Sequence, residues 1–182
     1  MEAAKTALGG VSIEEYLRSD YEPDAEYVDG AIEERPMGVF DHAAWQRAIL
    51  DWFMRHETEW DVLAIPELRV RVAPTRFRVP DVTVLDRRRP IEQIITRPPR
   101  AVFEVLSPED RVQRMTRKLN DYAAMGIGEI WVVNPDGPEF FRLLHGELRR
   151  RAEFGRPGQA MHFPLNAIAE LLPGRPQPPE QA

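Results

Sequence analysis

The sequence contains no cysteine and almost no lysine, since Lys5 and Lys118 are the only lysines among 24 basic residues. Without cysteine the chain can form no disulfide, no zinc–thiolate site and no thiol nucleophile. Arginine is always charged and binds through a planar fork, whereas lysine is a compact point charge whose pKa shifts when it is buried. Lys118 is therefore a candidate for a chemical task that arginine does not perform.

The sequence also lacks a basic-then-apolar leader and any apolar run near the ~18 residues that a membrane-spanning helix needs. We therefore expect a cytoplasmic protein that is neither secreted nor inserted in a membrane. The net charge of −6 argues against a general nucleic-acid coat protein, which is normally basic. It leaves a nuclease possible, because a local basic patch and a bound metal ion can both supply positive charge to phosphates.

The length and composition fit one globular domain, with 182 residues of which 43% are hydrophobic. We expect a flexible N-terminal arm over residues 1–10, a single domain over residues 11–172 and a disordered, proline-rich tail over residues 173–182.

Helical and strand-like patterns alternate along the domain. Helices are expected from Ser12, from Asp41 to about Glu57, from Ser107 to Met125 and from Asn166 to Leu172, with a helical turn over residues 91–95. Strands are expected over residues 62–72, 77–85, 101–106 and 129–133, and hairpins over residues 26–33 and 140–154. This order predicts an α/β fold with a central mixed β-sheet flanked by helices, in which the strands at 101–106 and 129–133 are parallel.

Glu104 is a carboxylate inside an apolar strand. Val102, Phe103, Val105 and Leu106 surround it in the sequence, so we expect the strand to be covered on both faces. An ionised, unpaired carboxylate would cost several kcal/mol there. A divalent cation, an arginine partner or protonation would each relieve that cost, and a structural ion pair explains Glu104 when it is taken alone.

Asp81 lies in an earlier strand, 23 residues before Glu104, which is enough chain for the two strands to be neighbours. It shares a strand face with Val79, Thr83 and Leu85. Two carboxylates on neighbouring strands repel each other, and a bound Mg²⁺ or Mn²⁺ would relieve the repulsion through oxygen ligands. Taken alone, Asp81 is better explained as an acid at a strand edge or in a turn after a proline.

The helix expected after the Glu104 strand carries Arg111, Arg114 and Lys118 along one stripe. Because we expect this helix to start at Ser107, its N-terminus would lie beside the carboxylates and favour anions there. A solvated basic face explains each cation by itself. A lone lysine on this helix favours a catalytic role.

Several segments form a specific combination: Arg78-Val79-Pro80-Asp81-Val82, Phe103-Glu104-Val105-Leu106-Ser107-Pro108, Lys118 with Tyr122, and the run from Gly126 to Val133. Glu26 to Gly30 and His42 extend the combination, which covers roughly residues 12–155. Together these segments resemble the restriction-endonuclease-like family that is expanded in cyanobacteria, within the PD-(D/E)xK nuclease superfamily. The resemblance implies a restriction-endonuclease-like α/β fold.

The resemblance also implies cleavage of phosphodiester bonds in DNA. Asp81 and Glu104 would ligate Mg²⁺ or Mn²⁺, and Lys118 would be the catalytic lysine. The superfamily lysine usually follows the second acid by two residues, where this chain has Leu106, so the lysine has moved to the next helix. Many relatives carry an acid four residues before it, where this chain has Arg114. A homodimer would let two sites address two DNA strands.

Further residues are weaker candidates. Glu67, on the strand face of Ile65 and Arg69, is either a third metal ligand or an exposed acid paired with an arginine. Glu26 and His42 are weaker still, and the tryptophans are expected to pack in the core. The candidate DNA contacts are Arg87, Arg88, Arg111 and Arg114, and Arg89, Arg97 and Arg100 extend the first pair into a basic region near the acid strands.

The sequence leaves two other hypotheses open. A non-catalytic module that keeps the fold and binds DNA or a protein would bind no divalent cation. A purely structural domain would pair its buried acids with Arg69, Arg71 or Arg78, and amide substitutions of Asp81 and Glu104 would then change stability alone.

Overall fold

The computed structural model of the protein describes residues 10–21, 24–35 and 38–174. The helices are α1 (Ile13–Arg18), α2 (Phe40–Arg55), α3 (Glu57–Trp60), α4 (Val112–Met125) and α5 (Asn166–Ala169). The strands are β1 (Ala25–Val28), β2 (Ala31–Glu34), β3 (Val62–Pro66), β4 (Val70–Ala73), β5 (Arg76–Arg78), β6 (Val82–Asp86), β7 (Ala101–Val105), β8 (Glu129–Asn134), β9 (Glu139–Leu144), β10 (Glu147–Arg151), β11 (Glu153–Phe154) and β12 (Phe163–Pro164). The expected arm and tail lie almost entirely outside the described residues.

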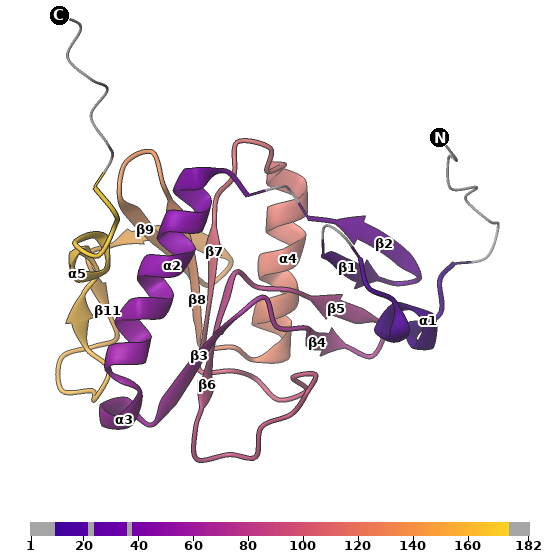
Figure 1. The fold of residues 1–182 in the computed structure, drawn as a ribbon, viewed down its shortest axis with the longest axis horizontal. Helices are drawn as coiled ribbons and strands as arrows, with labels where there is room; N and C mark the ends of the chain where they lie inside the picture. The colour runs from indigo at the N-terminus through magenta and orange to yellow at the C-terminus, as the bar shows by residue number, and fades with distance from the viewer. Residues whose placement is uncertain (1–9, 22–23, 36–37, 175–182) are drawn as a thin grey trace, which may run out of the picture.

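The strands form a large sheet and a small sheet beside it (Figure 1). The large sheet has six strands in the order β10-β9-β8-β7-β6-β3, and the small sheet has four in the order β2-β1-β5-β4. Strands β7 and β8 are parallel, as predicted for a β-α-β unit, while β6 and β3 run antiparallel beside them. The predicted mixed sheet flanked by helices is therefore confirmed.

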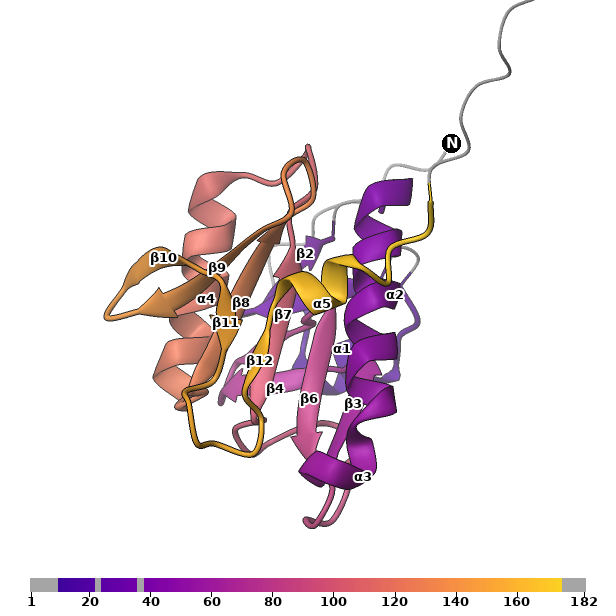
Figure 2. The same ribbon diagram turned by 90° about the vertical axis from the view of Figure 1, so that its left-hand side faces the viewer.

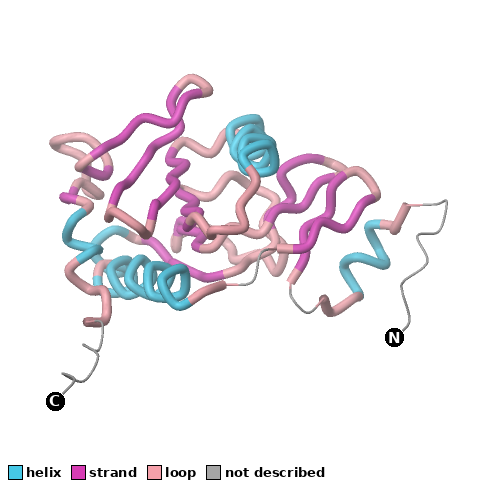
Figure 3. The backbone as a smooth tube through the Cα atoms, turned by 90° about the horizontal axis from the view of Figure 1, so that it is seen from above, coloured by secondary structure: helices cyan, strands magenta, loops and turns pink. Residues whose placement is uncertain are grey.

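Two helices cover opposite faces of the large sheet (Figure 2). On one face, Trp45, Ile49 and Phe53 of α2 are buried in a cluster with strand residues that include Phe103. On the other face, α4 contributes residues to a second cluster that also contains Val70 and Val72 of β4. Helix α4 therefore packs against both sheets, and Figure 3 shows it between them.

The predicted strands 62–72 and 77–85 are each wrong as single elements, because each one bends from one sheet into the other. The first divides into β3 and β4, and Glu67 at the bend has a left-handed backbone with φ of 53°. The second divides into β5 and β6 around Pro80 and Asp81. Proline lacks the N–H that a ladder hydrogen bond needs, which favours a break at that point. The bend places Asp81 where the two sheets meet.

The start of α4 also differs from the prediction. The helix begins at Val112 with Arg111 as its N-cap residue, not at Ser107. The segment before it closes on itself, since Asp110 Oδ2 accepts from the Ser107 N–H at 2.7 Å and Ser107 O accepts from the Asp110 N–H at 3.0 Å. These local hydrogen bonds satisfy the groups that a helix start would have used.

Two further predicted elements also differ from the structure. Helix α2 begins at Phe40 with Val39 as its N-cap, so Asp41 lies inside the first turn. Residues 91–95 form no helical turn, because Ile95 pairs with β4 through hydrogen bonds with Arg69 and Arg71. The capping of α1 is confirmed, as Ser12 Oγ accepts from the Glu15 N–H at 3.1 Å. Within the described ranges, no helix is both long and apolar enough for a bilayer crossing.

Candidate active site

Asp81 and Glu104 face each other at one end of β6 and β7. The antiparallel register pairs Val82 with Phe103, so one step further places Asp81 opposite Glu104, with both side chains on the face that α4 covers. The Val105 N–H donates to Asp81 Oδ2 at 2.7 Å across the same pair of strands. Both acids are buried, with exposures of 3% and 2%. The structure therefore brings the two predicted carboxylates together.

Asp81 is held by an arginine and a histidine from other parts of the chain. Arg35, just after β2, donates to Oδ1 at 2.6 Å, and His42 in the first turn of α2 lies 3.2 Å from Oδ2 through Nε2. Burial works to raise the pKa of Asp81, but the hydrogen bond from His42 and the charge of Lys118 outweigh it and hold the pKa below its usual value. Burial works to lower the pKa of His42, and the hydrogen bond to Asp81 outweighs it, so that pKa is raised.

Glu104 has partners of a different kind, both from α4. Lys118 Nζ donates to Oε2 at 2.8 Å, and the Tyr122 hydroxyl donates to Oε1 at 2.6 Å. Burial raises the pKa of Glu104 to about 7 in spite of the Lys118 charge, and repulsion from Asp81 and Glu26 adds to the rise. Of the two facing carboxylates, Asp81 is thus the one more readily ionised.

Lys118 bridges the large sheet and the small one. Besides Glu104, its ammonium group contacts Glu26 Oε1 in β1 at 2.8 Å and donates to Val79 O at 3.0 Å. Burial works to lower the pKa of Lys118, but the charges of Glu104 and Glu26 outweigh it and raise the pKa. Burial works to raise the pKa of Glu26, and the charges of Lys118 and Arg78 lower it to about 2. Lys118 is therefore held in its charged form.

A buried arginine holds Glu26, the second partner of Lys118, in place. Arg78 in β5 is only 1% exposed and contacts Glu26 at 2.9 Å, Glu33 at 3.0 Å and Asp121 at 2.7 Å. Its partners come from β1, β2 and α4, so one guanidinium ties three elements together around Lys118. Removing a partner from such a network leaves an uncompensated buried charge.

The third candidate metal ligand lies at the edge of the site. Glu67 is on a bend, not on the strand face predicted for it, and its side chain is 50% exposed. It contacts Arg35 at 3.4 Å, and the same guanidinium contacts Asp81. In the described part of the chain, no group of three acidic or histidine side chains is arranged to hold a metal ion. Metal binding by Glu67 stays a prediction.

The side chains present nevertheless suit a hard divalent cation. Mg²⁺ is commonly bound through one or two carboxylates, with waters and substrate phosphates completing its shell. Asp81 and Glu104 supply oxygen ligands to a cavity of about 30 Å³, which has room for a water molecule or a small cation. Ser107 also lines this cavity, and among the described residues its buried hydroxyl has no hydrogen-bond partner. A buried orphan hydroxyl of this kind is consistent with a site that takes a ligand.

The four predicted DNA-contact arginines separate into two pairs. Arg114 lines the cavity and lies 3.7 Å from Glu26, and the exposed Arg111 stands at the N-cap of α4 beside it. Arg87 and Arg88 follow the opposite end of β6, away from the carboxylates. The structure therefore places the first pair with Asp81, Glu104 and Lys118 and does not place the second pair there.

Sequence reasoning understated several side chains of the site. Glu26 and His42 were weak candidates, and Tyr122 was named beside Lys118 in the family resemblance without a role of its own. The isolated acid in the otherwise apolar β1 was a usable signal for Glu26, whose side chain is 0% exposed. No sequence signal marked Arg35, because its role depends on where the loop after β2 runs.

Comparisons with known proteins identify the family and the fold of the chain. The model of the Uma2 family, whose description reads "Putative restriction endonuclease", matches residues 13–164. The chain is also similar in fold to a crystal structure described as a putative nuclease belonging to DUF820 from Anabaena variabilis, with a TM-score of 0.73 and 21% identity over 88% of this chain and 98% of that one. No curated protein matches the chain.

Proposed function

Since the chain belongs to the Uma2 family of restriction-endonuclease-like proteins, we propose that it is an endonuclease that uses Mg²⁺ or Mn²⁺ to hydrolyse phosphodiester bonds in DNA. The observation that carries the proposal is the convergence of Asp81, Glu104 and Lys118 in one buried cavity. A family match and a shared fold support a nuclease, and the residues of the cavity supply the rest of the argument.

The two carboxylates would hold the metal ion, which when bound polarises a phosphate oxygen and lowers the pKa of a water ligand. Asp81 is kept ionised for this task by Arg35 and His42. To bind the metal ion, Glu104 would have to be deprotonated and to lose its hydrogen bond from Lys118. Because its pKa is about 7, the deprotonation occurs near neutral pH.

Lys118 would act as a cation and not as a base. Its pKa is raised, and Glu26 retains a contact with the ammonium group at 2.8 Å when Glu104 is engaged elsewhere. A fixed positive charge beside the cavity stabilises negative charge that develops on a phosphate oxygen. Arg114, which lines the cavity, and Arg111, at the N-cap of α4, would contact neighbouring phosphates and orient the strand.

A second candidate function is supported by the same contacts. Every carboxylate oxygen of Asp81 and Glu104 already has a partner within the protein. A module that has lost catalysis but still binds DNA or a protein would keep such a paired site. Calorimetric titration with Mn²⁺ separates the two, because the nuclease binds the ion and the non-catalytic module does not.

The direct test is nicking of supercoiled plasmid DNA in the presence of Mg²⁺ or Mn²⁺. We expect cleavage by the wild type, loss of cleavage by Glu104→Ala, and wild-type cleavage by Glu147→Ala, whose acid is exposed on β10. Circular dichroism of the folded variants excludes trivial unfolding. Equal activity of Glu104→Ala, or no activity of the wild type with either ion, contradicts the proposal.

The homodimer and the cytoplasmic location belong to the same proposal. Two copies would present two cavities to the two strands of a duplex. Light scattering at several protein concentrations measures the dimer, and a mass corresponding to one 21.0 kDa chain throughout would remove it from the proposal.

A further inference from the structure

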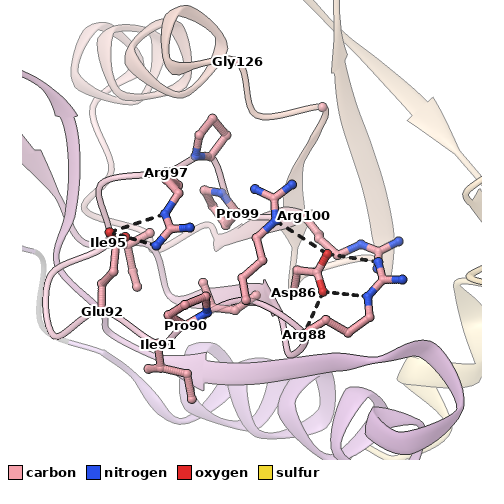
Figure 4. A pocket seen from close by; sticks show the side chains of 14 residues that line it. Asp86, Arg88, Pro90, Ile91, Glu92, Ile95, Arg97, Pro99, Arg100 and Gly126 are labelled. Carbon is pink, nitrogen blue, oxygen red and sulfur yellow. Dashed lines mark hydrogen bonds and ion pairs between the residues drawn. The ribbon is translucent and has the colours of Figure 1, made fainter.

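A second cavity lies at the other end of β6 and β7, beneath the connection between these strands. Its volume is about 510 Å³, within the range of ~300–1,000 Å³ that is typical of small-molecule sites. Figure 4 shows the residues that line it, which come from the β6–β7 connection and from the chain just after α4. Asp86 lies five residue steps after Asp81 along the extended chain, about 16 Å at ~3.3 Å per residue, so this cavity is distinct from the carboxylate site.

The cavity carries a surplus of positive charge. Four arginines and two acids line it, although the whole chain has a net charge of −6. Both acids are already engaged: Asp86 pairs with Arg88 at 3.1 Å, and Glu92 pairs with Arg97 at 3.5 Å. Arg89 approaches Asp86 only to 3.9 Å. The charge that remains available is therefore cationic.

Arg100 is the one of these four arginines without a direct ion pair among the described residues. Its charge still acts on Asp86 from beyond ion-pair distance and, after the hydrogen bond from Arg88, helps to lower the pKa of that acid. It is half-buried at the start of β7, where its backbone N–H donates to Val84 O at 2.8 Å. Among the residues that the structure describes, its guanidinium has no ion pair and no hydrogen-bond acceptor. A half-buried guanidinium without a hydrogen-bond acceptor keeps donors free, and an anion with several oxygens would satisfy them through a bidentate contact.

One wall of the cavity is apolar. Ile91 is 64% exposed at its rim, and Pro90, Pro98 and Pro99 line the space beside it. Figure 4 places Ile91 and Pro90 on the same side of the cavity as Glu92. An exposed large aliphatic side chain next to proline rings offers a flat surface for a planar group of a ligand.

The C-terminal end of α4 borders the cavity and works against an anion, because that end of a helix is the negative one. Its effect is reduced, since the Gly126 and Ile127 N–H groups donate to Ala123 O and Tyr122 O at 3.0 Å and 3.2 Å. The surplus of arginines outweighs it.

We propose that this cavity binds a nucleotide, with the phosphate on Arg100 and the base against Ile91 and Pro90. The phosphate accounts for the unpaired guanidinium, and the base accounts for the exposed apolar wall. The nucleotide is either a free mononucleotide or the 5′-terminal nucleotide of a nucleic-acid strand, which share this chemistry. The proposal does not rest on cleavage at the carboxylate site.

The test is binding by the full chain, carrying Glu104→Gln and kept in EDTA so that cleavage plays no part. The probes are thymidine 5′-monophosphate, thymidine, inorganic phosphate and a short 5′-phosphorylated single strand. Arg100→Gln is expected to weaken binding of the nucleotide about tenfold or more. Arg149→Gln, which removes the same charge from an exposed position on β10, is expected to have no effect. Ile91→Ala is expected to weaken the nucleotide about fivefold and to leave inorganic phosphate unchanged.

Each outcome of these binding experiments either supports or overturns the proposal. Saturable binding of the mononucleotide that is lost in Arg100→Gln supports a free nucleotide, and binding of the phosphorylated strand alone with the same loss supports a strand end. The proposal is overturned if none of the phosphorylated probes binds, if thymidine binds as well as its monophosphate, or if Arg100→Gln binds like Arg149→Gln. Thermal unfolding of each variant shows that a loss of binding is not a loss of fold.

Discussion

The two ends of the β6–β7 pair use charge in opposite ways. At the Asp81 end, acids and cations are buried and matched one to another, and the cavity between them measures about 30 Å³. At the Arg100 end, the cavity measures about 510 Å³ and the arginines outnumber the acids. A matched, buried set holds side chains in place for chemistry, whereas an open surplus of one sign attracts a ligand. One strand pair therefore joins the proposed reaction site to the proposed binding site.

The largest effect is expected at the matched end, from Lys118→Met. Loss of the fixed charge should lower the cleavage rate about 10²- to 10³-fold. Binding of Mn²⁺ should persist or strengthen, because Glu104 no longer shares an oxygen with the ammonium group. Plasmid nicking and calorimetry measure the two quantities. Lys5→Met is the matched control, as it changes the only other lysine. An unchanged rate in Lys118→Met would remove the lysine from the mechanism.

The next effect is on stability and contrasts the two ends directly. Glu26→Gln should lower the free energy of unfolding by about 3–5 kcal/mol, since Arg78 and Lys118 both lose a buried partner. Glu92→Gln, at the open end, should change it by less than about 1 kcal/mol because its partner Arg97 is exposed. Urea unfolding of both variants tests this. Similar losses from the two substitutions would show that burial does not distinguish the two ends.

Acid should weaken the matched end through Glu26. Its folded pKa of about 2 lies below the ordinary value of 4.5, so its contribution is complete above pH 4.5 and is lost as the pH falls toward 2. The loss is on the order of 3 kcal/mol. Unfolding free energies of the wild type should therefore fall across this window more steeply than those of Glu26→Gln. Parallel curves for the two proteins would contradict the assignment.

Glu104 makes stability depend on pH in the opposite direction. Its folded pKa of about 7 is above its ordinary value, so its contribution to stability is complete below pH 4.5 and is lost as the pH rises through 7. In a metal-free NMR experiment, we expect the chemical shift of the Glu104 carboxyl carbon to change with a midpoint near pH 7. The Glu26 carboxyl group should already be ionised above pH 4. A Glu104 midpoint near 4.5 would show that burial is not the dominant influence on it.

The smallest effect is expected at the open end. Glu92→Gln removes an acid from the arginine-lined cavity and should strengthen nucleotide binding about two- to fivefold. Fluorescence titration with a labelled nucleotide measures the change, and Glu147→Gln on β10 serves as the control. Weaker binding in Glu92→Gln would mean that the acid orients Arg97 for the ligand and does not compete with it.

The pattern of residue types was enough to select three residues that the structure brings together in one cavity. An acid in each of two apolar runs and a single lysine in the following helical repeat predicted Asp81, Glu104 and Lys118, because strand alternation and helical spacing are local properties. The parallel β7–β8 pair followed from the helix between them. These parts of the prediction needed no knowledge of distant contacts.

The failures occurred where contacts outside the periodic pattern decide, which are distant contacts for the two strands and local hydrogen bonds for α4. Both long strands continue in pattern through residues 67–69 and 79–81, yet each bends there into a second sheet. Because β5 pairs with β1, it belongs to the small sheet, and Asp81 lies where the chain passes from that sheet into the large one. The start of α4 moved to Val112 because the Ser107–Asp110 turn closed on itself. Periodicity does not report either event.

The sequence by itself determined which residues could perform the chemistry, since side-chain type and local spacing are written in the order of the chain. Only the tertiary structure decided which cations would meet which acids. Arg35 and His42 reach Asp81 from elements 46 and 39 residues away, and Arg78 joins three elements that are separate in sequence. The physical reason is that the charge state of a buried acid depends on the neighbours that folding brings to it, not on the residues beside it in the chain.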